Sequence, residues 1–235
     1  MAYDEAAQAL LLEVIEDWTA CGIFPTIREV TSEVWPRNLD RHEPDLGDDA
    51  MSLGVQSSRN VRNLAVRRLQ EDGHDARVAD HTLVVKRSGR VLHINKARAV
   101  SSAWDIDTQR WDDSEVRLLG ARANSQAYFP SDGALFAVRA GDPQALKHLH
   151  LTWQGLEHGP TRAWVGFPRI GDVPWFAVAP LAEADPVQRE HRPPVGPLQP
   201  SPNFDAMQTR EPEVKLKPQG NGSQEGVRPA GPDQS

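Results

Sequence analysis

The chain has 235 residues, of which 39% are hydrophobic, with a formal net charge of −7 and one cysteine. This length allows one large domain or two small ones, and a single cysteine excludes a disulfide framework, which fits a reducing cytoplasm. No apolar run is long enough to cross a membrane, and residues 1–5 lack the basic start of a signal peptide. We therefore expect a cytoplasmic protein with no membrane partner.

Charge is distributed unevenly along the chain. Residues 1–54 carry three basic and twelve acidic side chains, whereas residues 55–100 carry ten basic and four acidic ones. The overall negative charge argues weakly against a nucleic-acid partner. The basic segment, however, is the kind of local electrostatic footprint that nucleic-acid binding requires.

Two helices are predicted at the start of the chain. Apolar residues recur at helical spacing from Ala7 to Trp18, and Gly22 follows. Thr26 and Glu29 have the spacing of a capping box for a second, short helix. We expect this helix to end before Pro36, because the residue ahead of a proline disfavours helical geometry. Residues 36–54 are acidic, with two prolines and two glycines, which indicates a long loop.

The segment Gln56–Asp72 predicts an amphipathic helix, with Ser57 or Ser58 as its cap and Gly73 after its end. Outside one polar stripe, most of its circumference is apolar. The remaining stripe carries amides and guanidiniums, the groups that bind adenine and guanine edges in a major groove. These residues are Gln56, Arg59, Asn60, Asn63, Arg67 and Gln70. An ordinary surface helix with a solvated polar face is the alternative.

Residues 82–86 and 90–94 alternate apolar and polar side chains around Arg87-Ser88-Gly89, which predicts a β-hairpin. Basic residues lie at its tip and flanks. Three helices followed by a basic hairpin is the order of a winged helix-turn-helix. In such a domain the third helix enters the major groove.

The segment Gly22-Ile-Phe-Pro-Thr-Ile-Arg-Glu-Val30 resembles the start of the second helix in LexA-type repressors. Ser57-Ser58 and Arg67–Gly73 are similar to that family's recognition helix and its end. The resemblance covers residues 5–95, and it implies groove binding and, often, a dimer on paired half-sites. The family joins these two helices by a few residues, whereas residues 36–54 intervene here.

The second half of the chain predicts a small α+β domain at residues 101–184. Residues 104–113 form a polar, acidic linker, and short strands are predicted at 115–119, 134–139, 162–167 and 173–178. Asp142-Pro143 is a good helix start, although a strand remains possible for the residues after it. From residue 185 onward Pro, Gly and Gln predominate, which predicts a disordered tail.

Catalytic and metal chemistry find little support in the sequence. LexA-type proteins carry a self-cleaving serine–lysine protease domain, but Pro143 stands where the family's serine would follow Gly141-Asp142. His148 and His150 would share a face only on a strand, so a metal site there is a minor alternative. The only Glu-x-Lys triplet, Glu213–Lys215, lies in the predicted tail, and no phosphate-binding glycine loop occurs. We expect no catalytic residue, metal or cofactor.

The sequence thus predicts an α+β protein with a winged helix-turn-helix at residues 1–100, including the acidic insertion at 36–54, a small domain at 101–184 and a disordered tail at 185–235. We interpret it as a sequence-specific double-stranded-DNA-binding protein, a repressor-like transcriptional regulator and a possible homodimer. A nuclease targeted by its winged helix and a protein–protein adaptor are the alternatives. The predicted base contacts are Gln56, Arg59, Asn60, Asn63 and Arg67, and the predicted phosphate contacts are Ser58, Arg62, Lys86, Arg87 and Arg90.

Overall fold

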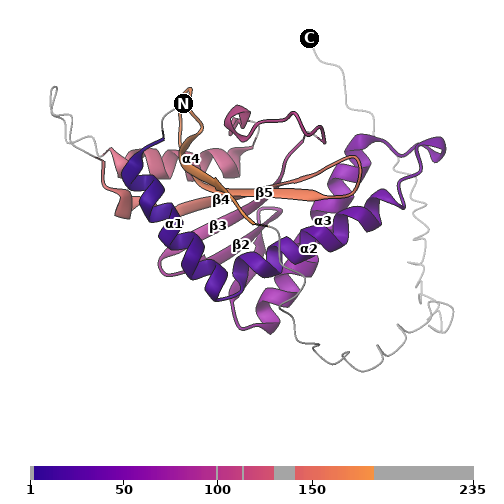
Figure 1. Ribbon diagram of the computed structural model, residues 1–235, viewed down its shortest axis with the longest axis horizontal. Helices are drawn as coiled ribbons and strands as arrows, with labels where there is room; N and C mark the ends of the chain where they lie inside the picture. Colours follow the sequence, from indigo (N-terminus) through magenta and orange to yellow (C-terminus); the bar gives the residue numbers. More distant parts are fainter. Residues whose placement is uncertain (1–2, 99, 113, 130–140, 183–235) are drawn as a thin grey trace, which may run out of the picture. The chain divides into compact units, whose positions relative to one another are not determined.

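The computed structural model describes residues 3–98, 100–112, 114–129 and 141–182. These residues form a mixed α+β fold of four α-helices and a six-stranded sheet (Figure 1). The elements in chain order are α1 (Glu5–Ala20), α2 (Ile23–Leu39), α3 (Ala50–Glu71), β1 (Asp75–Ala79), β2 (Thr82–Arg87), β3 (Arg90–Lys96), α4 (Glu115–Tyr128), β4 (His148–Gly155), β5 (Thr161–Pro168) and β6 (Trp175–Pro180). Short 3₁₀ turns lie at Pro44–Leu46, Ile106–Thr108 and Pro143–Ala145.

The strands follow chain order across the sheet, from β1 to β6. Neighbours are antiparallel except for β3 and β4, which run parallel and therefore need a long crossover, here the one that contains α4. The predicted hairpin is confirmed as β2 and β3. The sheet spans the predicted domain boundary at residue 100, because β3 pairs directly with β4. The α+β class is confirmed, whereas a winged helix is not, since the hairpin belongs to this larger sheet.

Helices cover both faces of the sheet, as the alternation of side chains along a strand allows. The helices α1, α2 and α3 pack on the face that carries Leu92, Leu151 and Val165, all of them buried. Figure 1 shows α4 on the opposite side of the strands from α1 and α2. On that side the rings of Trp111 and Trp175 meet edge to face, with centroids 4.7 Å apart. The predicted linker at residues 104–113 thus contributes Trp111 to a core cluster.

The helices on either side of the predicted loop at residues 36–54 are longer than expected. The helix α2 continues through Pro36 to Leu39, because its last turn is held by buried Asn38. That side chain donates to Ser57 Oγ (3.0 Å) and accepts from Asn60 Nδ2 (3.0 Å), both on α3. The helix α3 begins at Ala50, with a capping box between Asp49 and Ser52. Ser57 is therefore buried inside the helix and does not cap it.

In the second half of the chain, two segments form a different type of secondary structure from the one first expected. Residues 115–119 begin helix α4, whose buried residues Gly120, Ala121, Asn124 and Tyr128 have helical spacing. The helix expected from Asp142 is only a short 3₁₀ turn, and the residues after it form β4, the strand that was left open as the alternative. The sequence of β4 alternates polar and apolar residues from His148 to Gln154, as strands do, although most of these polar side chains are also buried on the face that α4 covers. The strands predicted at 162–167 and 173–178 are confirmed as β5 and β6, and β1 was not predicted. The strand predicted at 134–139 and the tail at 185–235 lie outside the described residues.

Candidate nucleic-acid interface

The outer face of α3 carries the predicted recognition surface. Its inner face repeats a buried residue every four positions, from Leu53 to Leu69, and this row packs against the core. The outer face is left to solvent. All five side chains that were predicted to contact base edges are exposed on it, and together they form what we call the α3 stripe: Gln56, Arg59, Asn60, Asn63 and Arg67.

Two of the predicted phosphate contacts, Ser58 and Arg62, lie next to the α3 stripe. Both are partly exposed and line a cavity beside the helix. The guanidinium of Arg62 donates to the carbonyl oxygen of His81 at 2.8 Å and to Asn63 Oδ1 at 3.4 Å. These bonds hold the charge of Arg62 at the edge of the stripe.

The hairpin cations lie elsewhere. Arg87 donates from Nε and Nη2 to the two carboxylate oxygens of Asp17 in α1, at 2.8 and 2.6 Å. This bidentate bond raises the pKa of Arg87 and lowers the pKa of Asp17. Arg90 donates to Gln144 Oε1 at 3.2 Å, and Lys86 is exposed on β2. Arg87 would have to leave its carboxylate partner to contact a phosphate, so we leave it out of the interface.

A cavity of about 880 Å³ opens beside the first half of α3. The cavity forms where the end of β3 extends past the start of β2. Leu83, the second residue of β2, pairs with Ile94, so residues 96–98 lie beyond the first residue of β2. Six charged side chains from α3, the β1–β2 turn, the end of β3 and the start of α4 line it: Arg59, Arg62, Asp80, Lys96, Arg98 and Arg117. Five of these described lining residues are basic, which makes the cavity suited to anions.

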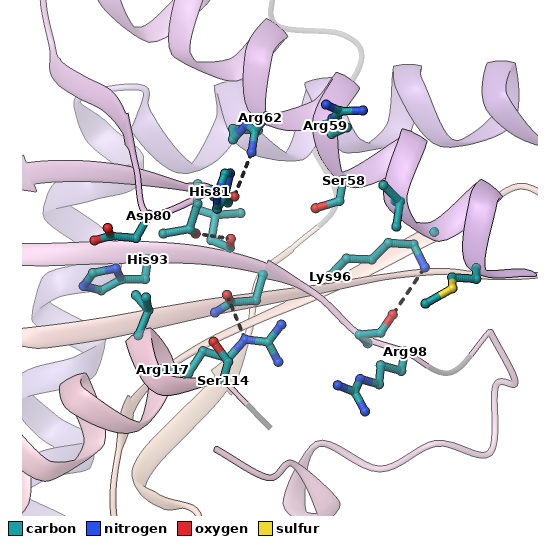
Figure 2. A pocket seen from close by; sticks show the side chains of 18 of the residues that line it. Ser58, Arg59, Arg62, Asp80, His81, His93, Lys96, Arg98, Ser114 and Arg117 are labelled. Atoms are coloured by element: carbon teal, nitrogen blue, oxygen red, sulfur yellow. Dashed lines mark hydrogen bonds between the residues drawn. The ribbon is translucent and has the colours of Figure 1, made fainter. Parts of the chain in front are cut away.

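The basic side chains converge from segments far apart in the sequence. Figure 2 shows Arg59 and Arg62 on one side of the cavity and Arg98 and Arg117 on the other. A second cavity of about 390 Å³ shares Lys96, Arg98 and Arg117 with the first. The two cavities therefore adjoin at these three cations.

Lys96 has an unusual environment for a lysine at such a site. Its ammonium lies over two tryptophan rings, 4.9 Å from the centre of Trp35 and 5.6 Å from that of Trp153. It also donates to the carbonyl oxygen of Ala97 at 3.3 Å. Burial lowers the pKa of Lys96, while the ring faces favour its charged form. An anion in the cavity would add a further interaction that favours the ammonium.

The start of α4 adds a partial positive charge to the cavity. Ser114 is the N-cap residue and makes no side-chain capping bond, and Val116 and Arg117 in the first turn also line the cavity. The first N–H groups of a helix have no partner within the helix, and they face anions favourably. Arg117 donates from Nε to Asn95 Oδ1 at 3.1 Å, which fixes the direction of its guanidinium.

Three histidines cluster on the α4 side of the sheet. His150 pairs in register with His93, and the His93 ring lies 5.4 Å from that of His150 and 5.9 Å from that of His148, measured between centroids. Residues 148–155 are a strand, so His148 and His150 do share a face. Within the described part of the chain, however, no group of three or more His, Cys, Asp or Glu side chains is arranged to hold a metal ion. Burial lowers the pKa of all three imidazoles, to about 4 for His93.

The sequence pointed to the cationic residues that α3 contributes to the cavity, Arg59 and Arg62, but not to those on its other side. Lys96 and Arg98 were visible only as basic residues flanking the hairpin, and Arg117 fell in a segment that was predicted to be a strand. Their proximity depends on the parallel pairing of β3 with β4 and on the crossover helix between them. No local pattern in the sequence carries that information.

Compared with known protein families, with curated proteins and with solved structures, the chain matches none. Over the residues that the structure describes, no helix combines the length and apolar character needed to cross a membrane. The function is therefore argued from the interface, and the resemblance to LexA-type repressors stays a prediction.

Proposed function

We propose that the protein binds double-stranded DNA through the α3 stripe, as a sequence-specific regulator of the repressor type, without catalysis. The observation that carries this proposal is the composition of the stripe: three amides and two guanidiniums, all exposed, on one face of a 22-residue helix. An exposed helix fits the major groove, where amides and guanidiniums make bidentate contacts with adenine and guanine. Asn60 Nδ2 already donates to Asn38 Oδ1, so the bidentate contacts are assigned first to the other four residues of the stripe.

The basic cavity beside the stripe supports the same proposal. A phosphate backbone that passes along α3 would lie close to Ser58 and Arg62, which line the cavity mouth and do not belong to the stripe. Such contacts fix the position of the helix on the duplex without specifying sequence. A second copy of the chain, reading a paired half-site, would extend the contact surface.

The proposal predicts different roles for two arginines of α3. Arg67→Ala is expected to weaken binding to the best site selected from a pool of random duplexes by about 1–3 kcal/mol, with relaxed preference at one base pair. Arg62→Ala is expected to weaken selected and random duplexes about equally and to reduce the salt dependence by about one counterion. Fluorescence anisotropy with the full chain at two salt concentrations measures both effects.

Arg122→Ala is the matched control, because Arg122 is exposed on α4 and does not line the cavity. It removes the same charge and the same side chain from a helix, and it should leave DNA binding unchanged. If Arg67→Ala behaves like Arg122→Ala on every duplex, the α3 stripe does not read bases and the proposal is wrong.

A further inference from the structure

The cavity beside α3 has the properties of a small-molecule site in addition to those of a surface for phosphates. Its volume of about 880 Å³ lies within the range of roughly 300–1,000 Å³ that is usual for ligand pockets. Of the α3 stripe only Arg59 lines it, whereas Asn63 and Arg67 do not, so the two surfaces meet at Arg59 and are otherwise distinct. We propose that the cavity binds a nucleoside phosphate.

The phosphate end of the ligand is assigned to the α4 side of the cavity. Arg98 and Arg117 present guanidinium groups there, and Lys96 lies at the junction with the second cavity. Guanidinium groups form paired hydrogen bonds with phosphate oxygens, and the first turn of α4 contributes N–H groups at the same side. A dianionic phosphate monoester matches this combination of charge and donors.

The nucleoside end is assigned to the apolar part of the lining. Met51 and Val55 of α3 are 76% and 51% exposed although both are large and apolar, and both line the cavity together with Ile94 and Ala97. A bare inorganic phosphate would leave these side chains and most of the volume unused. A ligand that carries a base and a sugar would cover them and remove apolar surface from water.

Trp104 offers a nucleobase a second apolar surface near the same cations. It lines the smaller cavity, beyond the three shared cations, and its ring packs edge to face on Trp164 with centroids 5.5 Å apart. A tryptophan held next to phosphate-binding cations is a typical platform for a nucleobase. A ligand with one base, such as AMP, uses the α3 side, and the surface of Trp104 is left to a ligand that carries a second base beyond the phosphates.

Isothermal titration calorimetry of the full chain with AMP, adenosine and inorganic phosphate tests the proposal. We expect AMP to bind with one site per chain, and adenosine and inorganic phosphate each to bind about tenfold or more weakly than AMP. Arg117→Ala is expected to weaken AMP binding about ten- to a hundredfold, as the loss of a charge-assisted bond does. Arg122→Ala, five residues further along the same helix and outside the cavity, should bind AMP as the unmodified chain does.

Arg59→Ala supplies a second test that does not disturb the bond between Arg117 and Asn95. Arg59 is exposed and lines the opposite wall, on the side assigned to the nucleoside, where its guanidinium can stack on the base. Its removal should therefore preserve the fold and still weaken AMP binding. The proposal is overturned if AMP gives no binding at millimolar concentration, if adenosine binds as tightly as AMP, or if Arg59→Ala and Arg122→Ala bind AMP equally. The titrations contain no DNA, so this proposal and the proposed function succeed or fail separately.

Discussion

Replacing Trp35 by alanine is expected to lower the free energy of unfolding by about 3–5 kcal/mol. Trp35 is 1% exposed, and its indole N–H donates to the carbonyl oxygen of Leu156 at 2.8 Å. Its ring packs edge to face on Trp153, with centroids 6.3 Å apart. It also lies so close to the backbone of Gly155 that a Cβ there would sit 2.2 Å from the ring. Alanine would therefore leave a void between α2 and β4 that no neighbour fills.

Urea denaturation of the full chain, followed by circular dichroism, measures this loss. Trp35→Phe is the matched control, since it keeps an aromatic ring and removes the indole N–H, and a smaller loss of about 1 kcal/mol is expected from the missing hydrogen bond. The ammonium of Lys96 lies over the same ring, so the alanine variant should also weaken AMP binding at the cavity. A loss of stability no larger than that of the phenylalanine variant would contradict the packing described for Trp35.

The sequence was informative wherever the structure depends on local chemistry. The apolar spacing from Ala7 to Trp18 was sufficient to predict α1, and two short segments rich in β-branched and apolar residues on either side of the turn at Ser88-Gly89 were sufficient to predict the β2–β3 hairpin. The exposed face of α3 was also predictable, because the buried and polar residues of a single helix separate at a period of 3.6 residues. All five residues of the α3 stripe were found in this way.

The sequence was uninformative where tertiary contacts decide the outcome. The extension of α2 beyond Pro36 depends on Asn38, whose partners are on α3. The strand β4 is a different case: its residues alternate polar and apolar from His148 to Gln154, and this local period favoured the strand over the helix that Asp142-Pro143 suggested. The cavity itself forms where β3 extends past β2, but its α4 side is supplied by the crossover between β3 and β4, two parallel strands whose pairing is non-local. For that reason Arg117 could not be assigned to the same site as Arg59.

The last prediction concerns acid stability and the histidine cluster. His150 is fully buried, and its pKa lies well below the ordinary value because burial disfavours the imidazolium. The guanidinium of Arg117 on α4, and a proton on His93 of β3 or His148 of β4, lower that pKa further because they add positive charge next to the ring. The ring edge of Trp111 covers the remaining side, with centroids 4.9 Å apart. In the folded protein His150 is therefore neutral at a pH at which the unfolded chain has already bound a proton.

Stability should consequently fall as the pH falls below about 6.5, the ordinary pKa of histidine. Above that pH both states carry a neutral imidazole and the contribution of His150 is fully present. Below it the unfolded state binds more protons, so each pH unit costs about 1.4 kcal/mol per such histidine until the folded state also protonates. His150→Leu is expected to reduce the slope of unfolding free energy against pH between 6.5 and 5 by about one proton, whereas His158→Leu, at an exposed turn position, should leave it unchanged. Urea titrations at four pH values give these slopes. Equal slopes for the two variants would mean that His150 is protonated in the folded protein, and the burial argument for the cluster would then be wrong.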